Sequence, residues 1–234
     1  MVEVLTSEEI ESHRWVALHM ARPQLDDATT AQFVAHLNDA ELDRYRATPL
    51  AHGRDTFLVG RTLVRAALAA ATGIGPAELA LEATSDGKLL APASGVHFNL
   101  SHCSSHFLVG LSRHPHVGVD IEDVRPYSPR MPPRFFLPDE IAHLDALPES
   151  ERQAAFFHFW VVKEACIKAY GRTLGPSLAT VPATPERRGR HGELAWEIVA
   201  IDDSVTAAIA LEAPDDDDTP VVREVTPEEV LAAF

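Results

Sequence analysis

The sequence predicts an α+β (mixed α/β) protein of two similar lobes, each with a long helix packed on a small antiparallel sheet. Two stretches have the apolar pattern of a long helix, residues 56–71 and 156–171. Each is followed along the chain by alternating patterns typical of antiparallel strands, within 96–112 and 193–212. Because both halves run from helix to strands, we expect an N-terminal lobe of residues 1–115 and a C-terminal lobe of residues 116–234.

In the first half, the pattern predicts a strand, a short helix, the long helix and a hairpin. These elements are expected at residues 15–20, 29–37, 56–71 and 96–112. Gly73 and Gly75 follow the long helix, and glycine commonly ends helices because it adopts the left-handed conformation without strain. The turn of the hairpin, residues 101–105, is small and polar and places His102 at the bend.

In the second half, the pattern predicts a strand, two helices, a hairpin, a last strand and a capped helix. They are expected at residues 117–124, 139–147, 156–171, 193–212 and 221–225, with the capped helix beginning at Thr226. Five prolines lie between residues 126 and 138, so this segment is expected to be a crossing loop.

The composition is that of an ordinary globular protein, with 46% hydrophobic and 24% charged residues among 234. No apolar run is long enough for a membrane span, and the first residues do not resemble an export signal. The net charge of -15 argues against nucleic acid or an anionic membrane as a partner, since phosphates need a basic surface. Cys103 and Cys166 lie beside expected core positions, so we expect reduced thiols in a cytoplasmic protein.

Two carboxylates lie on one face of the strand at 117–124. Val117, Val119 and Ile121 alternate onto one face, which leaves Asp120 and Glu122 together on the other. Adjacent carboxylates repel unless a cation bridges them, and Mg²⁺ is a suitable ion because it prefers oxygen ligands. The alternative is an exposed edge strand with a solvated acidic face.

Three charges lie on the helix at 156–171 among apolar residues. Lys163 falls within an aromatic stripe, and Glu164 and Lys168 lie one turn apart beside it. The simple alternative is a surface ion pair between Glu164 and Lys168, with Lys163 extending toward water. If Asp120 and Glu122 meet this helix, three carboxylates and two lysines form a site for phosphoryl transfer with Mg²⁺.

Several arginines fall within one segment of this acidic chain and offer a place for a phosphorylated ligand or an acidic protein surface. They are Arg44, Arg46, Arg54, Arg61 and Arg65. The alternative interpretation of Arg54, Arg61 and Arg65 is a solvated face of the helix at 56–71.

Two motifs in this order resemble the paired signature of 4′-phosphopantetheinyl transferases of the larger, surfactin-synthetase-activating type. They are Gly118-Val119-Asp120-Ile121-Glu122 and Trp160-x-x-Lys163-Glu164-Ala165-x-x-Lys168. Further matches extend the resemblance over residues 40–180: Gly60-Arg61-x-Leu63-x-Arg65, Gly87-Lys88, Phe98-Asn99-Leu100-Ser101-His102, Arg134-Phe135-Phe136 and residues 174–178. One departure is Leu89, where the family usually has a proline after the Gly-Lys pair.

The resemblance implies a monomeric pseudo-dimer that binds coenzyme A (CoA) and Mg²⁺ between its lobes, and whether Mn²⁺ can replace Mg²⁺ stays open. Such enzymes move phosphopantetheine from CoA to a serine of an apo acyl or peptidyl carrier protein and release 3′,5′-ADP. The products are holo carriers of polyketide, fatty-acid or nonribosomal peptide synthases, including those of secondary metabolism and antibiotic biosynthesis. The segment 134–147 would lie near the carrier.

The resemblance also implies roles for individual residues. Asp120, Glu122 and Glu164 would bind the metal, and Glu164 would also act as general base toward the carrier serine. Lys168 would stabilise the pyrophosphate, so Asp120, Glu164, Lys168 and His102 are the expected catalytic residues.

The remaining implied roles concern the nucleotide and its phosphates. The contacts would come from Lys88, Ser101, His102, Lys163 and Lys168, and the 3′-phosphate would bind Arg44 and Arg54. Two other functions stay open: an Mg²⁺-dependent phosphodiester hydrolase, and a carrier-binding module that has the fold without catalysis.

Overall fold

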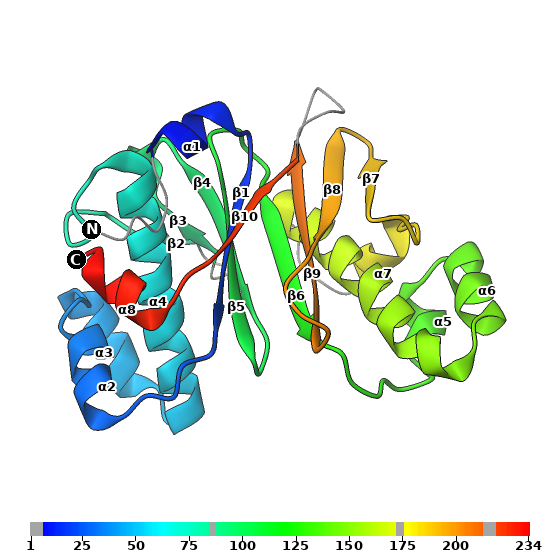
Figure 1. Cartoon of the computed structure of the whole chain (residues 1–234), viewed down its shortest axis with the longest axis horizontal. Coiled ribbons are helices and arrows are strands. Elements are labelled where there is room, and N and C mark those ends of the chain that lie inside the picture. Colours follow the sequence, from blue (N-terminus) through cyan, green and yellow to red (C-terminus); the bar gives the residue numbers. More distant parts are fainter. Residues whose placement is uncertain (1–6, 85–87, 172–175, 213–218) are drawn as a thin grey trace.

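The computed structural model describes residues 7–84, 88–171, 176–212 and 219–234 and shows two lobes side by side (Figure 1). The two main sheets face each other in the centre, and the helices lie on the outer sides. The predicted α+β class, with one long helix packed on each sheet, is confirmed. Among the described residues, no helix has both the length and the apolar character needed to cross a bilayer.

The first sheet has the strand order β10-β1-β5-β4. Its strands are β1 (Val16–Ala21), β4 (His97–His102), β5 (His106–Ser112) and β10 (Val221–Glu224). Strands β4 and β5 form the predicted antiparallel hairpin, and β1 pairs antiparallel with β5 and parallel with β10. A separate two-stranded sheet is formed by β2 (Glu82–Ala83) and β3 (Leu89–Leu90).

The long helix α4 (Ala51–Thr72) covers the first sheet and ends at Gly73, whose φ of 70° is left-handed as predicted. The other helices of this side are α1 (Ser7–Ser12), α2 (Asp27–Val34), α3 (Asp39–Ala47), the 3₁₀ helix η1 (Pro92–Ser94) and α8 (Pro227–Ala232). Helix α3 was not predicted, because most of its residues are polar and give no apolar periodicity. It begins with a capping box between Asn38 and Glu41.

The second sheet has the strand order β6-β9-β8-β7 and is antiparallel throughout. Its strands are β6 (Gly118–Asp123), β7 (Arg188–His191), β8 (Leu194–Val199) and β9 (Val205–Glu212). The long helix α7 (Glu149–Ala169) packs on β6, β9 and β8. Three shorter elements complete this side: α5 (Pro132–Phe135), α6 (Pro138–Ala146) and the 3₁₀ helix η2 (Pro176–Thr180).

A third core lies between the two sheets and joins the lobes. Val119 and Ile121, predicted on one face of their strand, are buried there with Leu108 of β5 and Ile209 of β9. Burial of such a side chain contributes roughly 1.5–3 kcal/mol, so the two sheets are held together by apolar packing. The opposite face of β6 therefore carries Asp120 against α7.

The end of the chain returns to the first sheet. Strand β10 pairs with β1, and α8 packs on α4, so residues 221–232 lie with the first lobe in space. The predicted division at residues 115 and 116 follows the order of the chain and stays a prediction. The order of elements does not reveal this return. Strands β1 and β10 pair in parallel although most of the chain separates them, and no local pattern shows such a pairing.

Candidate functional site

Three elements of both lobes meet at the candidate site: the end of β4, strand β6 and the last turns of α7. Gly118 permits the close approach of β6 and α7, because a Cβ there would lie 2.2 Å from the Ala165 carbonyl oxygen and 2.3 Å from the Ala169 nitrogen. The two backbones therefore touch. As a result, Asp120 on β6 faces Lys168 on α7 directly.

Asp120 lies at the centre of the site and is only 2% exposed. Its Oδ1 accepts hydrogen bonds from Ser101 Oγ at 2.9 Å and from Lys168 Nζ at 2.5 Å. Its Oδ2 is buried and has no hydrogen-bond partner among the residues that the structure describes. A buried carboxylate oxygen without a partner is unfavourable, so this atom is suited to a ligand that is absent here.

Glu164 and Lys168 lie beside Asp120, one helical turn apart on α7. The Lys168 ammonium is 3.4 Å from Glu164 Oε2 and also donates to Ser101 Oγ at 3.1 Å. Burial, followed by the charge of Asp120, raises the pKa of Glu164 to about 8. Burial alone would lower the pKa of Lys168, but Asp120 and Glu164 outweigh it and raise the value.

Glu122 is half-buried and forms an ion pair with Arg125, which lies two residues after the end of β6. Its Oε2 accepts a hydrogen bond from Arg125 Nη1 at 2.9 Å. Burial and then the charge of Asp120 raise the pKa of Glu122, although Arg125 acts in the opposite direction. Arg125, which is mostly exposed, was not among the sequence predictions.

Burial and then the charge of Asp120 raise the pKa values of Glu122 and Glu164, the two other carboxylates predicted to bind Mg²⁺, but the three side chains are not arranged around one point. Within residues 7–84, 88–171, 176–212 and 219–234, no group of three or more His, Cys, Asp or Glu side chains is arranged to hold a metal. Two observations fit a cation all the same: the unpartnered Asp120 Oδ2 and the raised pKa of Glu164. The metal assignment of Asp120, Glu122 and Glu164 stays a prediction.

His102 and Lys88 lie at the edge of this site, as the resemblance implies. The exposed His102 ring lies near Phe107, with centroids 5.8 Å apart, and partial burial and the charges of Arg22 and Lys168 lower its pKa. Lys88 Nζ lies 3.5 Å from the Lys168 carbonyl oxygen and lines a cavity of about 210 Å³. The turn before Lys88, residues 85–87, and residues 174–175 of the family resemblance lie outside the described residues.

The structure corrects the assignment of Lys163 to the nucleotide. Its side chain is fully buried, and its ammonium is 2.8 Å from Glu140 Oε2. It also donates to the carbonyl oxygens of Leu178 at 3.1 Å and Val181 at 2.5 Å. All three donors of the ammonium are thus used by protein groups, and Lys163 joins α7 to α6, to η2 and to the residue that follows η2.

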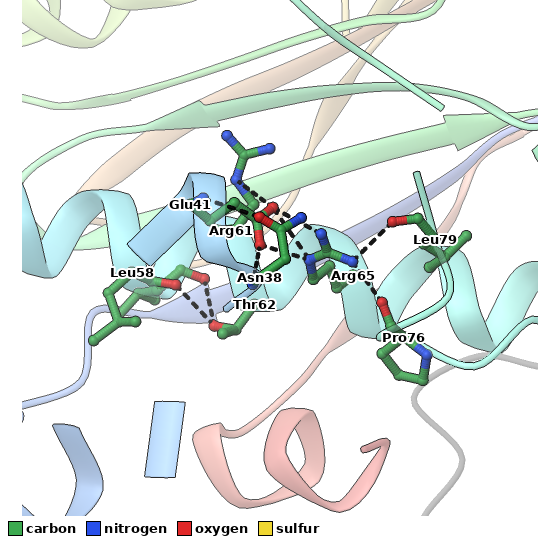
Figure 2. Close-up of polar contacts among 9 residues, drawn as sticks. Asn38, Glu41, Leu58, Arg61, Thr62, Arg65, Pro76 and Leu79 are labelled. Carbon is green, nitrogen blue, oxygen red and sulfur yellow. Dashed lines mark hydrogen bonds and ion pairs between the residues drawn. The ribbon is translucent and has the colours of Figure 1, made fainter. Parts of the chain in front are cut away.

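The arginines of the first lobe separate into buried and exposed groups. Arg65, 1% exposed, binds both oxygens of Glu41 and the carbonyl oxygens of Pro76 and Leu79, as Figure 2 shows. Arg61 Nε lies 3.4 Å from Glu41 Oε1, and Arg61 is 7% exposed. The interpretation of these two arginines as a solvated face is therefore wrong, because both are buried inside the lobe beside the Glu41 carboxylate.

The two arginines expected at the 3′-phosphate differ in availability. Arg44 is exposed on α3, with its guanidinium over the Phe57 ring. Arg54 is half-buried and donates to the carbonyl oxygens of Thr48 and Pro49, both at 3.2 Å. Their role at a phosphate stays a prediction, and the geometry favours Arg44.

Sequence reasoning missed the carboxylates that pair with the buried basic residues. Glu41 and Glu140 both occupy the third position of a helix, where each bonds back to the backbone nitrogen at the helix start. The pattern Asn38-x-x-Glu41 is visible in the sequence and could have located Glu41, whereas Leu137 at the start of α6 has no capping side chain and gives no such signal for Glu140. Their second role, toward Arg65 and Lys163, depends on helix packing and has no local signal.

Comparison with known proteins agrees with the resemblance. The sequence model of the 4′-phosphopantetheinyl transferase superfamily matches residues 116–209. The 4′-phosphopantetheinyl transferase HetI of Nostoc sp. (strain PCC 7120) is 31% identical over 220 residues, which are 88% of this chain and 89% of the relative. The 4′-phosphopantetheinyl transferase psf-1 of Bacillus pumilus is 32% identical over 171 residues, 73% of this chain and 71% of the relative. The 4′-phosphopantetheinyl transferase Sfp of Bacillus subtilis is 27% identical over 158 residues, 67% and 70% of the two chains.

Proposed function

The chain belongs to the 4′-phosphopantetheinyl transferase superfamily, and we propose that it transfers 4′-phosphopantetheine from CoA to the serine of an apo carrier protein. The observation that carries this proposal is the cluster formed across the two lobes by Ser101, Asp120, Glu164 and Lys168. The cluster combines a carboxylate of raised pKa, a positive charge and an unpartnered carboxylate oxygen. Transfer of a phosphoryl group to a hydroxyl needs these three kinds of group.

We propose Asp120, Glu122 and Glu164 as the residues that hold Mg²⁺, or Mn²⁺ in its place. The unpartnered Asp120 Oδ2 supports this assignment, as does the like-charge repulsion that helps to raise the pKa of Glu164. When bound, the ion would neutralise charge on the pyrophosphate of CoA. Glu122 would have to exchange its contact with Arg125 for the ion, which is feasible because that ion pair is exposed to water.

Glu164 is the proposed general base. The oxygen of the carrier serine attacks the phosphorus that bears pantetheine, and the bond from this phosphorus to the oxygen of 3′,5′-ADP breaks. The serine proton passes to the Glu164 carboxylate, directly or through a water molecule. Burial raises the pKa of Glu164 in the metal-free protein and so makes its carboxylate a stronger base than an ordinary one, and a bound cation would favour the ionised form that accepts the proton.

The basic and polar groups around Asp120 are the proposed contacts of the nucleotide. Lys168, which pairs with Asp120 in this structure, would also contact the pyrophosphate, and its positive charge would stabilise the departing 3′,5′-ADP. Ser101, His102 and Lys88 are the proposed contacts of phosphate oxygens of the same ligand, supported by the bond of Ser101 to Lys168 and the nearness of Lys88 to the Lys168 carbonyl oxygen. Arg44 is the proposed contact of the 3′-phosphate.

Incubation with CoA, Mg²⁺ and purified apo carriers tests the proposal by the mass of the carrier. We expect a gain of one phosphopantetheine, absent when the carrier serine is alanine. A panel of acyl and peptidyl carriers, compared by kcat/KM, then identifies the synthases served. No mass gain with any carrier would reject the transferase, and cleavage of CoA without a carrier would favour the hydrolase. Carrier binding without modification would favour the non-catalytic module.

A further inference from the structure

The 103–105 turn, made of Cys103, Ser104 and Ser105, belongs to the first lobe and contacts the second lobe next to the candidate site. It joins β4 to β5 and follows directly after Ser101 and His102. A displacement of this short turn would displace both of these side chains. The contacts that hold the turn therefore decide where two proposed ligand-binding residues lie.

Asp123 of the second lobe binds this turn through both of its carboxylate oxygens. Oδ2 accepts the backbone N–H of Ser104 at 2.9 Å and also the Ser104 hydroxyl. Oδ1 accepts the Ser105 hydroxyl at 2.5 Å. Hydrogen bonds to an ionised acceptor are roughly twice as strong as neutral ones, so these three bonds form a firm connection. Asp123 directly follows Glu122, one of the proposed metal ligands.

Arg22 holds the opposite side of the turn from within the first lobe. Its Nε donates to the Ser104 carbonyl oxygen at 2.8 Å, and its Nη2 donates to the Cys103 carbonyl oxygen at 2.7 Å. The guanidinium also lies over the Phe107 ring, 4.6 Å from its centroid. The turn is thus fixed between a cation of one lobe and a carboxylate of the other.

A second connection between the lobes begins at the same serine. The Ser105 hydroxyl has one proton, which it donates to Asp123, so its oxygen is free to accept the Nδ1–H of His106 at 2.9 Å. The Nε2 of His106 lies 3.5 Å from Asp202 Oδ2, in the turn between β8 and β9, and the two form an ion pair when the imidazole carries a proton on both nitrogens. Ser105 therefore contacts the second lobe both directly and through His106.

We propose that Asp123 is a positioning residue that holds Ser101 and His102 against Asp120 by binding the 103–105 turn across the lobes. The inference rests on the proposed function, because Ser101 and His102 are assigned there to CoA. It differs from a purely structural role in one respect. Asp123 must act on CoA through the residues that the turn carries, and not only through the stability of the fold.

A double-mutant cycle with His102 distinguishes these two roles. The variants are Asp123→Asn, His102→Ala and their combination, with CoA affinity measured by calorimetry and transfer by kcat and KM for CoA. Asp203→Asn is the matched control, since Asp203 is an exposed carboxylate in the turn between β8 and β9. All assays are made at a temperature at which circular dichroism shows each variant to be folded.

We expect Asp123→Asn to weaken CoA binding and kcat/KM about tenfold in the otherwise unchanged protein, since small misplacements of binding groups are costly. In the His102→Ala protein, the same change is expected to cost less than about threefold, because one of the two residues that Asp123 positions is already gone and only the contribution of Ser101 is left. Asp203→Asn should alter neither quantity. Equal factors in both backgrounds, or a loss of stability with unchanged CoA affinity, would overturn the inference.

Ser104→Ala with Ser105→Ala provides a second route if Asp123→Asn does not fold. This pair keeps Asp123 but removes its two hydroxyl contacts, and the same dependence on His102 is expected. Failure of the proposed function gives a different result, since the unchanged protein would then bind CoA without transfer or not bind it. If the enzyme is active but Asp123→Asn costs the same factor with and without His102, the positioning role is rejected and the proposed function is not.

Discussion

Lys163 and Lys168 lie five residues apart on α7. The polar groups around Lys163 all have partners, whereas one polar atom beside Lys168 has none among the described residues. Lys163 has three partners, the Glu140 carboxylate and two carbonyl oxygens, and its side chain is 0% exposed. Lys168 binds Asp120, Glu164 and Ser101, and its side chain is 22% exposed. At Lys168, one carboxylate oxygen of its partner Asp120 has no hydrogen bond within the described part of the chain.

The pair of Glu41 and Arg65 in the first lobe resembles the surroundings of Lys163. Arg65 distributes its donors over both oxygens of Glu41 and two carbonyl oxygens, and the buried oxygens of Glu41 are all used. The comparison teaches that buried charge alone does not mark a ligand site. A complete set of partners indicates a structural role, whereas an unpartnered atom beside competing like charges indicates a place for a ligand.

The largest effect is expected for Asp120→Ala, which removes the centre of the incomplete cluster. We expect kcat/KM for transfer to fall by about 10³-fold or more, because the variant loses the proposed metal ligand and the partner of Lys168. High Mg²⁺ should not restore activity. The measurement is the initial rate of holo carrier formation over a range of Mg²⁺ concentrations, with Asp203→Ala as the control. Near-normal turnover of Asp120→Ala would show that the site has been misassigned.

Lys163→Met tests the complete cluster and should act mainly on stability. Without the ammonium, Glu140 stays buried and unpaired, and breaking a buried pair in this way costs about 3–5 kcal/mol of the free energy of unfolding. Urea denaturation measures this loss. In the folded variant, the KM for CoA should change little.

Lys168→Met is the matched control for this comparison. We expect it to lose transfer activity, and we expect added Mg²⁺ to recover its stability, since a cation can replace the lost charge beside Asp120. Mg²⁺ should not recover Lys163→Met. A rise in the KM for CoA in Lys163→Met as large as that in Lys168→Met would contradict the separation of the two lysines.

The raised pKa of Glu164 predicts a pH dependence of stability in the metal-free protein. Between the usual value of 4.5 and the folded value of about 8, the folded state keeps a proton that the unfolded state has released. The free energy of unfolding should therefore fall as the pH rises through this window, by at most about 1.4 kcal/mol per pH unit.

Chemical denaturation from pH 5 to pH 8, in the presence of a chelator, measures this slope. Glu164→Gln should show a smaller slope than the unchanged protein, because the amide does not titrate. Saturating Mg²⁺ should also reduce the slope, since a cation favours the ionised carboxylate. Identical slopes for the two proteins would mean that other groups cause the dependence.

The smallest effect is expected for Arg125→Ala at the edge of the site. The exposed pair with Glu122 should contribute less than about 1 kcal/mol to stability. Because Glu122 no longer has to give up this partner, half-maximal activity should need about twofold less Mg²⁺. An increase in the Mg²⁺ requirement would indicate that Arg125 helps to hold the bound state. The test is a Mg²⁺ titration of the transfer rate.

Most secondary structure could be predicted, because it follows from local periodicity. The alternation around Asp120 and the helical spacing of Glu164 and Lys168 are both confirmed, as is the hairpin that carries His102. Helix α4 begins at Ala51, earlier than the pattern indicated, because its first turn is polar, has no buried residue and therefore shows no apolar periodicity. Strand β7 has no apolar alternation and was missed for that reason.

The sequence alone was sufficient for the two-lobe class, the family and the identity of the charged residues, because periodicity and motif spacing are local properties. Which of those charges are satisfied depended on contacts between distant segments. Lys163 and Lys168 look equivalent in the motif, yet packing of α6 gives one a complete set of partners, and the approach of β6 at Gly118 gives the other Asp120. The return of β10 to β1 and the bond of Asp123 to the 103–105 turn have the same origin, since both join segments that no local pattern connects.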